Sequence, residues 1–261
     1  MSKVDLHIEI DGNGPPVVLI HGWGMHAGLF KPMIEELNNR FTFYSLDLPG
    51  HGNSNTNLNL SDLDSVTHQI VKILQQQVSA EINLLGWSLG GLIAQRMASL
   101  YPTWVAKLIL VSSSACFEKK PDWLHGIESD ILDHFSSELK ADSKTTLDRF
   151  LALQFMGTSQ QKENVKRARD LLAMKAVPSV TALQQGLTLL KNTDLRNNLA
   201  DIKCPCLLLS GERDSLVPSK AIRFMSEHLP QAHCYLIKSG SHAPFLSHAA
   251  AFNSNVEQFL L

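Results

Sequence analysis

The feature that most constrains this chain is the pentapeptide Gly86-Trp87-Ser88-Leu89-Gly90, which stands between an apolar run and a helix-like run. Strand, sharp turn and helix in this order form the setting of a nucleophile elbow, a turn that lifts one serine hydroxyl clear of a sheet. Glycines at both ends permit the strained turn and let the helix pack close to the strand. The pattern predicts that Ser88 is a nucleophile; a plain strand–helix turn with an exposed serine is the alternative.

A serine nucleophile needs a base and an acid that orients the base, and one known chain order is Ser, Asp or Glu, His. Two apolar runs downstream each end in a polar loop, and open α/β sheets place their sites just past the carboxyl ends of strands. His242 stands in the second loop and is the predicted base. Asp214 and Glu212 share the first loop, and spacing favours Asp214 without excluding Glu212. Asp47 precedes the serine, so it does not fit this order.

Acyl transfer also requires two backbone N–H groups aimed at the oxygen of the tetrahedral intermediate. Leu89, directly after the serine, is predicted to supply one of them. The second is predicted at Trp23, because an early apolar run leads into His21-Gly22-Trp23-Gly24, whose glycines let the backbone approach a substrate. A turn with a packed tryptophan is the alternative for this loop.

Length and composition limit the class of protein. A chain of 261 residues with 44% hydrophobic residues is suited to one large α/β domain with a sizeable core. The net charge of −2 and a pI near 6.6 argue against a nucleic-acid-binding protein, which is usually basic. The start of the chain has no apolar leader-like run, and no stretch approaches the length of a membrane span.

The four cysteines form no C-x-x-C pair and no metal-binding spacing. We interpret them as reduced packing residues of a cytoplasmic protein. No metal or cofactor is expected, and we expect a monomer that binds neither nucleic acid nor membrane.

Apolar and amphipathic segments alternate along most of the chain, which predicts an α/β fold with a mostly parallel sheet covered by helices on both faces. The predicted strands are Leu6–Ile10, Val17–Ile20, Phe41–Leu46, Ile82–Leu85, Lys107–Val111, Cys206–Leu209 and Tyr235–Ile237. The predicted helices are Phe30–Asn39, Ser61–Ser79, Gly91–Leu100, Ser219–Leu229 and Ala249–Leu261.

The segment 112–195 breaks this alternation, because it contains amphipathic helical runs and no convincing strand. These runs are Asp122–Phe135, Ser143–Met156, Gln160–Ala176 and Ser179–Asn192. We therefore expect a core formed by residues 1–111 and 196–261, and an all-helical lid of residues 112–195 above the serine. Phe150, Leu153, Gln154 and Phe155 lie near the end of one helical run and are candidates for an apolar slot. This slot would face Trp23, Trp87 and Leu89; an ordinary packed helix face is the alternative.

Charge is unevenly divided within the lid segment. Residues 118–142 carry seven acids and three bases, whereas residues 144–175 carry seven bases and three acids. Lys162, Lys166 and Arg169 stand at i, i+4 and i+7, so they share one face of a helix. This face is either a solvated surface or a docking surface for an acidic partner.

With these residues in view, the chain resembles the α/β-hydrolases and, within them, the pimeloyl-[acyl-carrier protein] methyl ester esterases of biotin synthesis. The resemblance covers nearly the whole length, and its most specific part is the lid motif from Arg149 to Thr158. The matching pieces are His21–Gly24, Asp47–Gly50, Gly86–Gly91, Arg149–Gln154 with Met156–Thr158, Leu189–Lys191 with Asp194–Arg196, Asp214–Pro218 and His242–Phe245.

The resemblance implies hydrolysis of the methyl ester of a pimeloyl chain carried on acyl carrier protein, which would free the ω-carboxyl group. It implies a triad of Ser88, Asp214 and His242, which selects Asp214 over Glu212. It also implies an oxyanion hole of Trp23 and Leu89. The remaining substrate contacts implied by the family are Phe150, Leu151, Ala152, Leu153 and Gln154.

The family's carrier-docking positions fall on Arg149, Lys162 and Lys166, the two lysines standing where the family has arginine. Lysine keeps the charge but loses the bidentate geometry of arginine. A fourth docking position falls on Thr145, which departs from the pattern. Two alternatives to this function remain: a broad carboxylesterase or carbon–carbon bond hydrolase of the same fold, and a non-catalytic binding protein on this fold.

Overall fold

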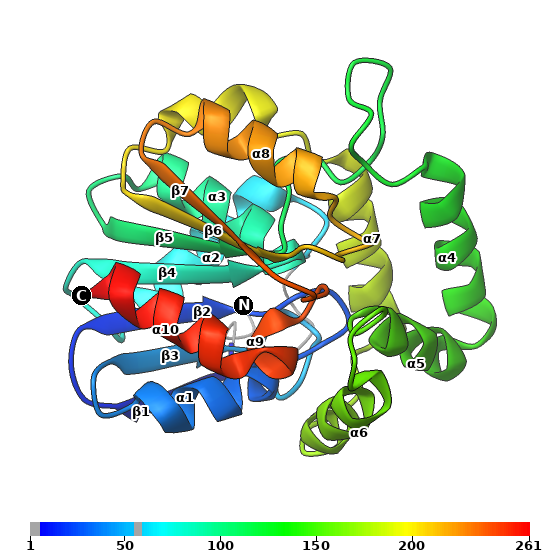
Figure 1. The fold of residues 1–261 in the computed structure, drawn as a ribbon, viewed down its shortest axis with the longest axis horizontal. Helices are drawn as coiled ribbons and strands as arrows, with labels where there is room; N and C mark the ends of the chain where they lie inside the picture. The colour runs from blue at the N-terminus through cyan, green and yellow to red at the C-terminus, as the bar shows by residue number, and fades with distance from the viewer. Residues whose placement is uncertain (1–5, 55–58) are drawn as a thin grey trace.

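The computed structural model describes residues 6–54 and 59–261, and within them seven strands form one sheet in the order β1-β3-β2-β4-β5-β6-β7 (Figure 1). All neighbouring pairs are parallel except β1 with β3. The strands are β1 (Ile8–Gly12), β2 (Pro16–Ile20), β3 (Thr42–Leu46), β4 (Ile82–Trp87), β5 (Val105–Val111), β6 (Cys206–Gly211) and β7 (Ala232–Ile237). The predicted α/β class with a mostly parallel sheet is confirmed.

Helices cover both faces of the sheet because the central strands are apolar on both sides. Val17 and Leu19 of β2 pack with α1 and α10, while Val18 and Ile20 pack with α2 and α3. The helices are α1 (Lys31–Leu37), α2 (Leu63–Leu74), α3 (Leu89–Leu100), α4 (Ser129–Ala141), α5 (Ser143–Leu153), α6 (Gln161–Leu172), α7 (Val180–Asn192), α8 (Ser219–His228), α9 (Pro244–Ser247) and α10 (Ala249–Leu260), with 3-10 turns η1 (Ala27–Phe30) and η2 (Arg196–Asp201).

Helices α4 to α7 follow β5 and precede β6, and they lie beyond the carboxyl ends of the parallel strands (Figure 1). Helix α4 packs on α5 and α7, and α5 packs on α6. The polar loops after β4, β6 and β7 open at the same end of the sheet. The residues of those loops therefore lie at the end of the sheet that these four helices cover.

The predicted helix over 122–135 is wrong for residues 122–128, because α4 begins at Ser129 and continues to Ala141. The preceding segment folds back on itself, and Ile127 N–H donates to the Phe117 carbonyl. Gly126 lies against the Glu118 backbone, where a Cβ atom would meet the carbonyl carbon at 2.4 Å. Trp123 is buried and donates from Nε1 to the Cys116 carbonyl. These contacts satisfy the backbone groups that a helix would otherwise have paired.

Most other predicted elements are present with shifted ends. Strand β1 ends at Gly12 rather than Ile10, and β7 begins at Ala232, three residues before the predicted start. Helix α2 is shorter than predicted at both ends. Asp62 caps its first turn by accepting from the N–H groups of Asp64 and Ser65, and the helix ends at Leu74 rather than Ser79. The leader prediction rests largely on residues 1–5, which lie outside the described residues. Across 6–54 and 59–261, no helix is both long enough and apolar enough to cross a membrane.

Candidate active site

Ser88 occupies a strained turn between β4 and α3. Its backbone has φ 54° and ψ −118°, a left-handed conformation that costs a non-glycine residue about 1–3 kcal/mol. A Cβ atom at Gly86 would lie 2.5 Å from the Gly90 carbonyl oxygen, and one at Gly90 would lie 2.3 Å from the Ile20 carbonyl oxygen. Glycine at both positions is therefore required for α3 to start this close to β4 and β2.

The surroundings of Ser88 fix its backbone and bury its side chain. Its N–H donates to the Val111 carbonyl, and its carbonyl accepts from Gly91 N–H and from the Ser113 hydroxyl. The residue is 5% exposed. Because Ser88 directly precedes α3, the positive end of the helix dipole is directed at the site.

Asp214 and His242 meet in the loops after β6 and β7. His242 Nδ1 lies 3.0 Å and 2.9 Å from the two carboxylate oxygens of Asp214, and both side chains are inaccessible or nearly so. Asp214 Oδ1 also accepts from the N–H groups of Leu216 and Val217 at 2.9 Å each. The carboxylate is thereby held in one orientation, and Nδ1 of the imidazole is its donor.

The other imidazole nitrogen, Nε2, is buried and has no hydrogen-bond partner within residues 6–54 and 59–261. The loop that carries it is tied to the elbow, because Trp87 Nε1 donates to the His242 carbonyl at 2.9 Å. The Trp87 and His242 rings lie 5.9 Å apart between centroids. His242 therefore presents a basic, unpaired nitrogen next to the residue that precedes Ser88. Catalytic hydrogen bonds are often formed only once substrate is bound.

Glu212, the alternative acid, is exposed and accepts from Ser239 N–H at 3.3 Å. Asp214, by contrast, is buried against the imidazole. The geometry therefore favours Asp214 as the partner of His242.

The loop after β2 passes beside Ser88. His21 Nε2 accepts from Leu48 N–H at 2.8 Å, so Nδ1 carries the proton and donates to the Gly22 carbonyl at 2.8 Å. A Cβ atom at Gly22 would lie 3.1 Å from Ser88 Cβ. This loop therefore passes beside Ser88 at Gly22, the residue before Trp23.

Trp23 is held in place by aromatic contacts and by a hydrogen bond to helix α7. Its ring packs edge-on against Phe150 of α5 and Phe135 of α4, with centroid distances of 4.8 Å and 5.5 Å. Its Nε1 donates to the Leu183 carbonyl of α7 at 2.8 Å. Helices α4, α5 and α7 thus converge on one side chain of the loop beside Ser88.

The side chains of the predicted substrate segment, residues 150–154, point in two directions. Phe150 faces Trp23, whereas Leu151 packs toward α6. Gln154 is buried, and its carbonyl accepts from the N–H of Ala243, which follows His242. The end of α5 therefore contacts both the Trp23 loop and the His242 loop.

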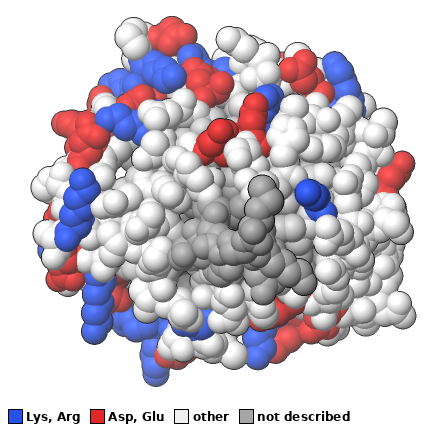
Figure 2. Space-filling view, turned by 180° about the vertical axis from the view of Figure 1, so that it is seen from behind, with Lys and Arg blue, Asp and Glu red and all other residues white. Residues whose placement is uncertain are grey.

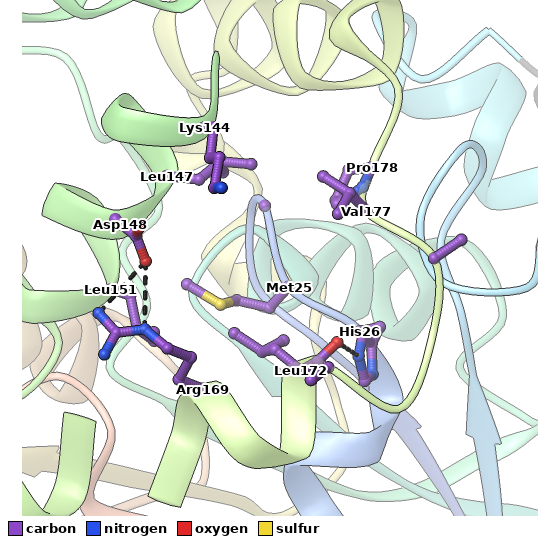
Figure 3. Close-up of a pocket in the computed structure, with 13 residues that line it drawn as sticks. Met25, His26, Lys144, Leu147, Asp148, Leu151, Arg169, Leu172, Val177 and Pro178 are labelled. Atoms are coloured by element: carbon purple, nitrogen blue, oxygen red, sulfur yellow. Dashed lines mark hydrogen bonds and ion pairs between the residues drawn. The ribbon is translucent and has the colours of Figure 1, made fainter. Parts of the chain in front are cut away.

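A cavity of about 340 Å³ lies beside this segment, between α5, α6 and the loop at Gly24 (Figure 3). Asp148 and Arg169 form an ion pair across it, with Nη2 and Oδ1 3.3 Å apart. Ser88, Asp214 and His242 do not line it. The lining residues are Gly24, Met25, His26, Lys144, Leu147, Asp148, Leu151, Arg169, Leu172, Ala173, Ala176, Val177 and Pro178.

Basic side chains of α5 and α6 differ in whether they are already paired. Arg149 contacts Glu138 of α4, Nη1 to Oε1, at 2.8 Å. Lys162 and Lys166 are exposed on α6 and form no ion pair within the described residues. Figure 2 shows Lys and Arg side chains along the edge of the molecule where α4–α7 lie, with Asp and Glu among them.

A buried polar cluster joins the core to the connector between α6 and α7. Lys175 Nζ contacts Asp47 Oδ2 at 3.0 Å and Glu9 Oε1 at 2.8 Å, and its side chain is only 7% exposed. Burial raises the pKa of the Asp47 carboxyl, but N–H donors at Ala27 and Asn53 and the nearby Lys175 outweigh it and hold the pKa below its usual value. The cluster fixes the α6–α7 connector on the core.

Two histidines of this region make the protein sensitive to acid. Burial lowers the pKa of His21 to about 3 and that of His51 to about 4, so both are neutral in the folded protein. In the unfolded chain they bind protons below pH of about 6.5. Because the unfolded state then binds more protons, stability is lost as pH falls from about 6.5 toward these values.

We therefore expect the free energy of unfolding to fall by about 2 kcal/mol per histidine between pH 7 and pH 5. His51→Asn keeps a donor close to the position of Nδ1, which bonds the Pro49 carbonyl, but cannot titrate. Urea unfolding at several pH values should show a shallower pH dependence in this variant. An unchanged dependence would contradict the assignment of His51 as a neutral buried imidazole.

Residues 6–54 and 59–261 contain no group of three or more His, Cys, Asp or Glu side chains that could hold a metal ion. The polar groups in the loops after β4, β6 and β7 include a serine at the elbow, and an acid and an imidazole that are hydrogen-bonded to each other. Such a set suits nucleophilic attack on a carbonyl carbon.

Comparison with known proteins agrees with this architecture. The family model of the α/β hydrolase fold matches residues 15–249. The pimeloyl-[acyl-carrier protein] methyl ester esterase of Xylella fastidiosa (strain M23) is 39% identical over 257 residues, covering 98% of each chain. The protein of the same name from Nitrosomonas europaea is 38% identical over 249 residues, covering 95% of this chain and 97% of that one.

Among solved structures, an esterase from Exiguobacterium antarcticum superposes with a TM-score of 0.88 at 23% identity, covering 97% of this chain and 94% of that one. This likeness shows the fold. The full-length similarity to the two named esterases extends beyond the core and includes the four helices of residues 129–192.

Proposed function

Because this chain belongs to the α/β hydrolase family and, within it, to the pimeloyl-[acyl-carrier protein] methyl ester esterases, we propose that it is a serine carboxylesterase that hydrolyses the methyl ester of pimeloyl-acyl-carrier protein. The products are methanol and a carrier-bound chain with a free ω-carboxyl group, as biotin synthesis requires. The observation that carries the proposal is the near-full-length match to esterases of this name, joined to a buried Asp214–His242 pair beside an elbow serine.

The proposed mechanism is two-step acyl transfer. His242 Nε2 accepts the Ser88 proton as the hydroxyl attacks the ester carbonyl, and Asp214 stabilises the imidazolium through Nδ1. Methanol leaves with the proton returned by His242. Water then attacks the acyl-enzyme by the same route, so the proposed cycle needs neither metal nor cofactor.

The oxyanion of each tetrahedral intermediate is proposed to be held by the backbone N–H groups of Trp23 and Leu89. Leu89 opens α3, where the N–H groups of the first turn have no partner within the helix. Gly22 lies against Ser88, and Trp23, the next residue, is proposed to supply the second N–H. One such donor typically contributes about 10²–10³ to kcat.

Residues 112–195 are proposed to act as a lid over this site, with residues 1–111 and 196–261 as the hydrolase core. The pimeloyl chain would lie against the end of α5, where Phe150 meets Trp23 and Gln154 meets the His242 loop. The cavity at Gly24 is lined by the apolar side chains of Met25, Leu147 and Leu151 and borders this segment. It offers the carrier-linked end of the chain a route toward α6.

The acidic carrier is proposed to dock on Arg149, Lys162 and Lys166. The two lysines support this best, because they are exposed and their charges are not neutralised by ion pairs within the described residues. Arg149 already contacts Glu138, so a carrier would have to compete for it. As part of the same proposal, the enzyme is a cytoplasmic monomer; its four cysteines are free, as is typical of a reducing compartment.

We expect Lys162→Glu combined with Lys166→Glu to raise KM for the carrier-bound ester by about tenfold, because two weak surface attractions become repulsions. The effect should shrink toward 1 M salt, where the Debye length is about 3 Å. Steady-state kinetics at low and high salt measure both quantities.

The matched control is Lys220→Glu with Lys238→Glu, two exposed lysines outside the lid segment, which should leave KM unchanged. Hydrolysis of a small uncharged ester should be nearly the same in all three proteins. Equal losses on the small ester and the carrier-bound ester would indicate a damaged lid, and the docking surface would then be wrong.

The proposed substrate is tested by comparing carrier-bound methyl esters of pimelate with those of shorter and longer diacids. The proposal predicts the highest kcat/KM for the pimeloyl chain on its carrier. Faster hydrolysis of free esters than of any carrier-bound ester would favour a broad carboxylesterase instead.

A further inference from the structure

Gly186 lies in the middle of helix α7, an unfavourable position for glycine in a helix. A Cβ atom on Gly186 would lie 2.6 Å from Cδ1 and 3.1 Å from Nε1 of Trp23. It would also lie 3.4 Å from Cδ2 of Leu89. Carbon atoms pack best at about 3.5–4.0 Å, so α7 approaches the Trp23 ring more closely than any other residue type would allow.

The Trp23 ring has little room to yield to such an atom. Its Nε1 is bound to the Leu183 carbonyl, one turn earlier on α7. Phe150 and Phe135 pack edge-on against it, and the residue is 1% exposed. A methyl group at Gly186 would therefore displace the indole, or α7, or both.

Displacement of the indole would reach the backbone beside the serine. Trp23 follows Gly22, where a Cβ atom would lie 3.1 Å from Ser88 Cβ and 3.2 Å from Trp87 Cε3. The Gly22 carbonyl and the Trp23 N–H belong to one planar peptide unit, which His21 Nδ1 holds through the carbonyl oxygen. A displaced indole would pull on this unit through the Trp23 Cα atom and tilt it, together with the N–H that is the proposed oxyanion donor.

We propose that Gly186 is a positioning residue of the oxyanion hole. By leaving the space of one Cβ atom empty, it lets α7 hold the Trp23 indole and so sets the direction of the Trp23 N–H. This inference rests on the proposed function, because it assigns Gly186 a role at the same site. It also links the lid to the chemical step through α7.

The test is Gly186→Ala with p-nitrophenyl butyrate, a small ester that needs no carrier. We expect kcat to fall about 10–100-fold, because a misplaced donor loses much of its effect on the oxyanion, while KM changes less than about threefold. The melting temperature should not fall by more than about 8 °C, because the better helix propensity of alanine offsets part of the cost of overpacking against the indole. Each rate is divided by the fraction of the protein whose Ser88 reacts with a fluorophosphonate, so that kcat refers to active enzyme only.

The matched control is Thr188→Ala, an exposed position on the same helix, which should leave kcat unchanged. A second readout is the Kd of an alkyl boronic acid, which forms a tetrahedral adduct with the serine. In Gly186→Ala this Kd should rise in proportion to the loss of kcat, because the adduct and the intermediate use the same N–H groups.

A double-mutant cycle identifies the contact responsible. Trp23→Ala keeps the backbone N–H but removes the indole, so adding Gly186→Ala to it should change kcat less than about twofold. An equal loss in both backgrounds, an unchanged kcat in Gly186→Ala, or a lower kcat with unchanged boronate affinity would overturn the proposal. Failure of Gly186→Ala to fold in both backgrounds would also overturn it, as the role would then be structural.

The outcome is separable from that of the proposed function. If Ser88→Ala abolishes hydrolysis of the same ester and Gly186→Ala does not impair it, only the positioning role fails. If Ser88→Ala retains activity, the proposed nucleophile is wrong, whatever Gly186→Ala does.

Discussion

Replacing Ser88 by alanine is expected to lower kcat by about 10⁴–10⁶, with little change in the free energy of unfolding. The hydroxyl forms the acyl-enzyme in the proposed mechanism, and no other hydroxyl shares its position at the end of β4. His242→Ala should lower kcat to a similar extent, because serine and base act as one unit. The double variant should be no worse than either single variant, since removing one member already disables the unit.

Kinetics on a small ester, with thermal unfolding of each variant, measure both parts of this prediction. Ser215→Ala is the matched control, because Ser215 is exposed and lies in the loop of Asp214. We expect it to keep kcat within about twofold of the parent. Appreciable turnover by Ser88→Ala would mean that a different group attacks the ester.

Asp214→Asn is expected to lower kcat by about 10⁴, the size of effect known for the equivalent change in a serine protease triad. The carboxylate accepts from His242 Nδ1 and from the N–H groups of Leu216 and Val217. An asparagine can keep those backbone bonds only by presenting its NH₂ group toward Nδ1. The imidazole would then be held in the tautomer that has no free lone pair on Nε2.

The variant Glu212→Gln tests whether Asp214 or Glu212 is the acid that orients His242. Glu212 is exposed, and among the described residues its carboxylate accepts a hydrogen bond only from the Ser239 N–H, so we expect kcat to change less than about threefold. The two variants are compared by kcat at one saturating substrate concentration. A larger loss in Glu212→Gln than in Asp214→Asn would reverse the assignment of the acid.

The sheet and the elbow could be predicted because their signals are local. Strands β2, β4, β5 and β6 are short apolar runs, each followed by glycine or polar residues. Ser88 could be singled out because the close approach of α3 to β4 demands glycine at fixed positions around it. The edge strand β7 was found only in part, since its exposed residues His233 and Cys234 interrupt the apolar pattern.

Contacts between distant segments could not be predicted in this way. Gly186 and Trp23 are 163 positions apart, and an isolated glycine in a helical pattern does not show what it packs against. The ion pair between Arg149 and Glu138 depends on how α4 packs against α5. Counting charges along the sequence gives no information about this packing. The helix predicted over 122–135 starts too early because the first residues of that range bond to the chain before them. Trp123 Nε1 donates to the Cys116 carbonyl and Ile127 N–H to the Phe117 carbonyl, and helical periodicity does not show such contacts.

The most direct test of the proposed hydrolysis is mass spectrometry of acyl carrier protein loaded with the pimeloyl methyl ester, before and after incubation with the enzyme. We expect the carrier to lose the mass of one methylene group, as the methyl ester becomes a free acid while the thioester stays intact. Ser88→Ala should leave the loaded carrier unchanged. Loss of the whole acyl chain, or an unaltered carrier after incubation with active enzyme, would contradict the proposed function.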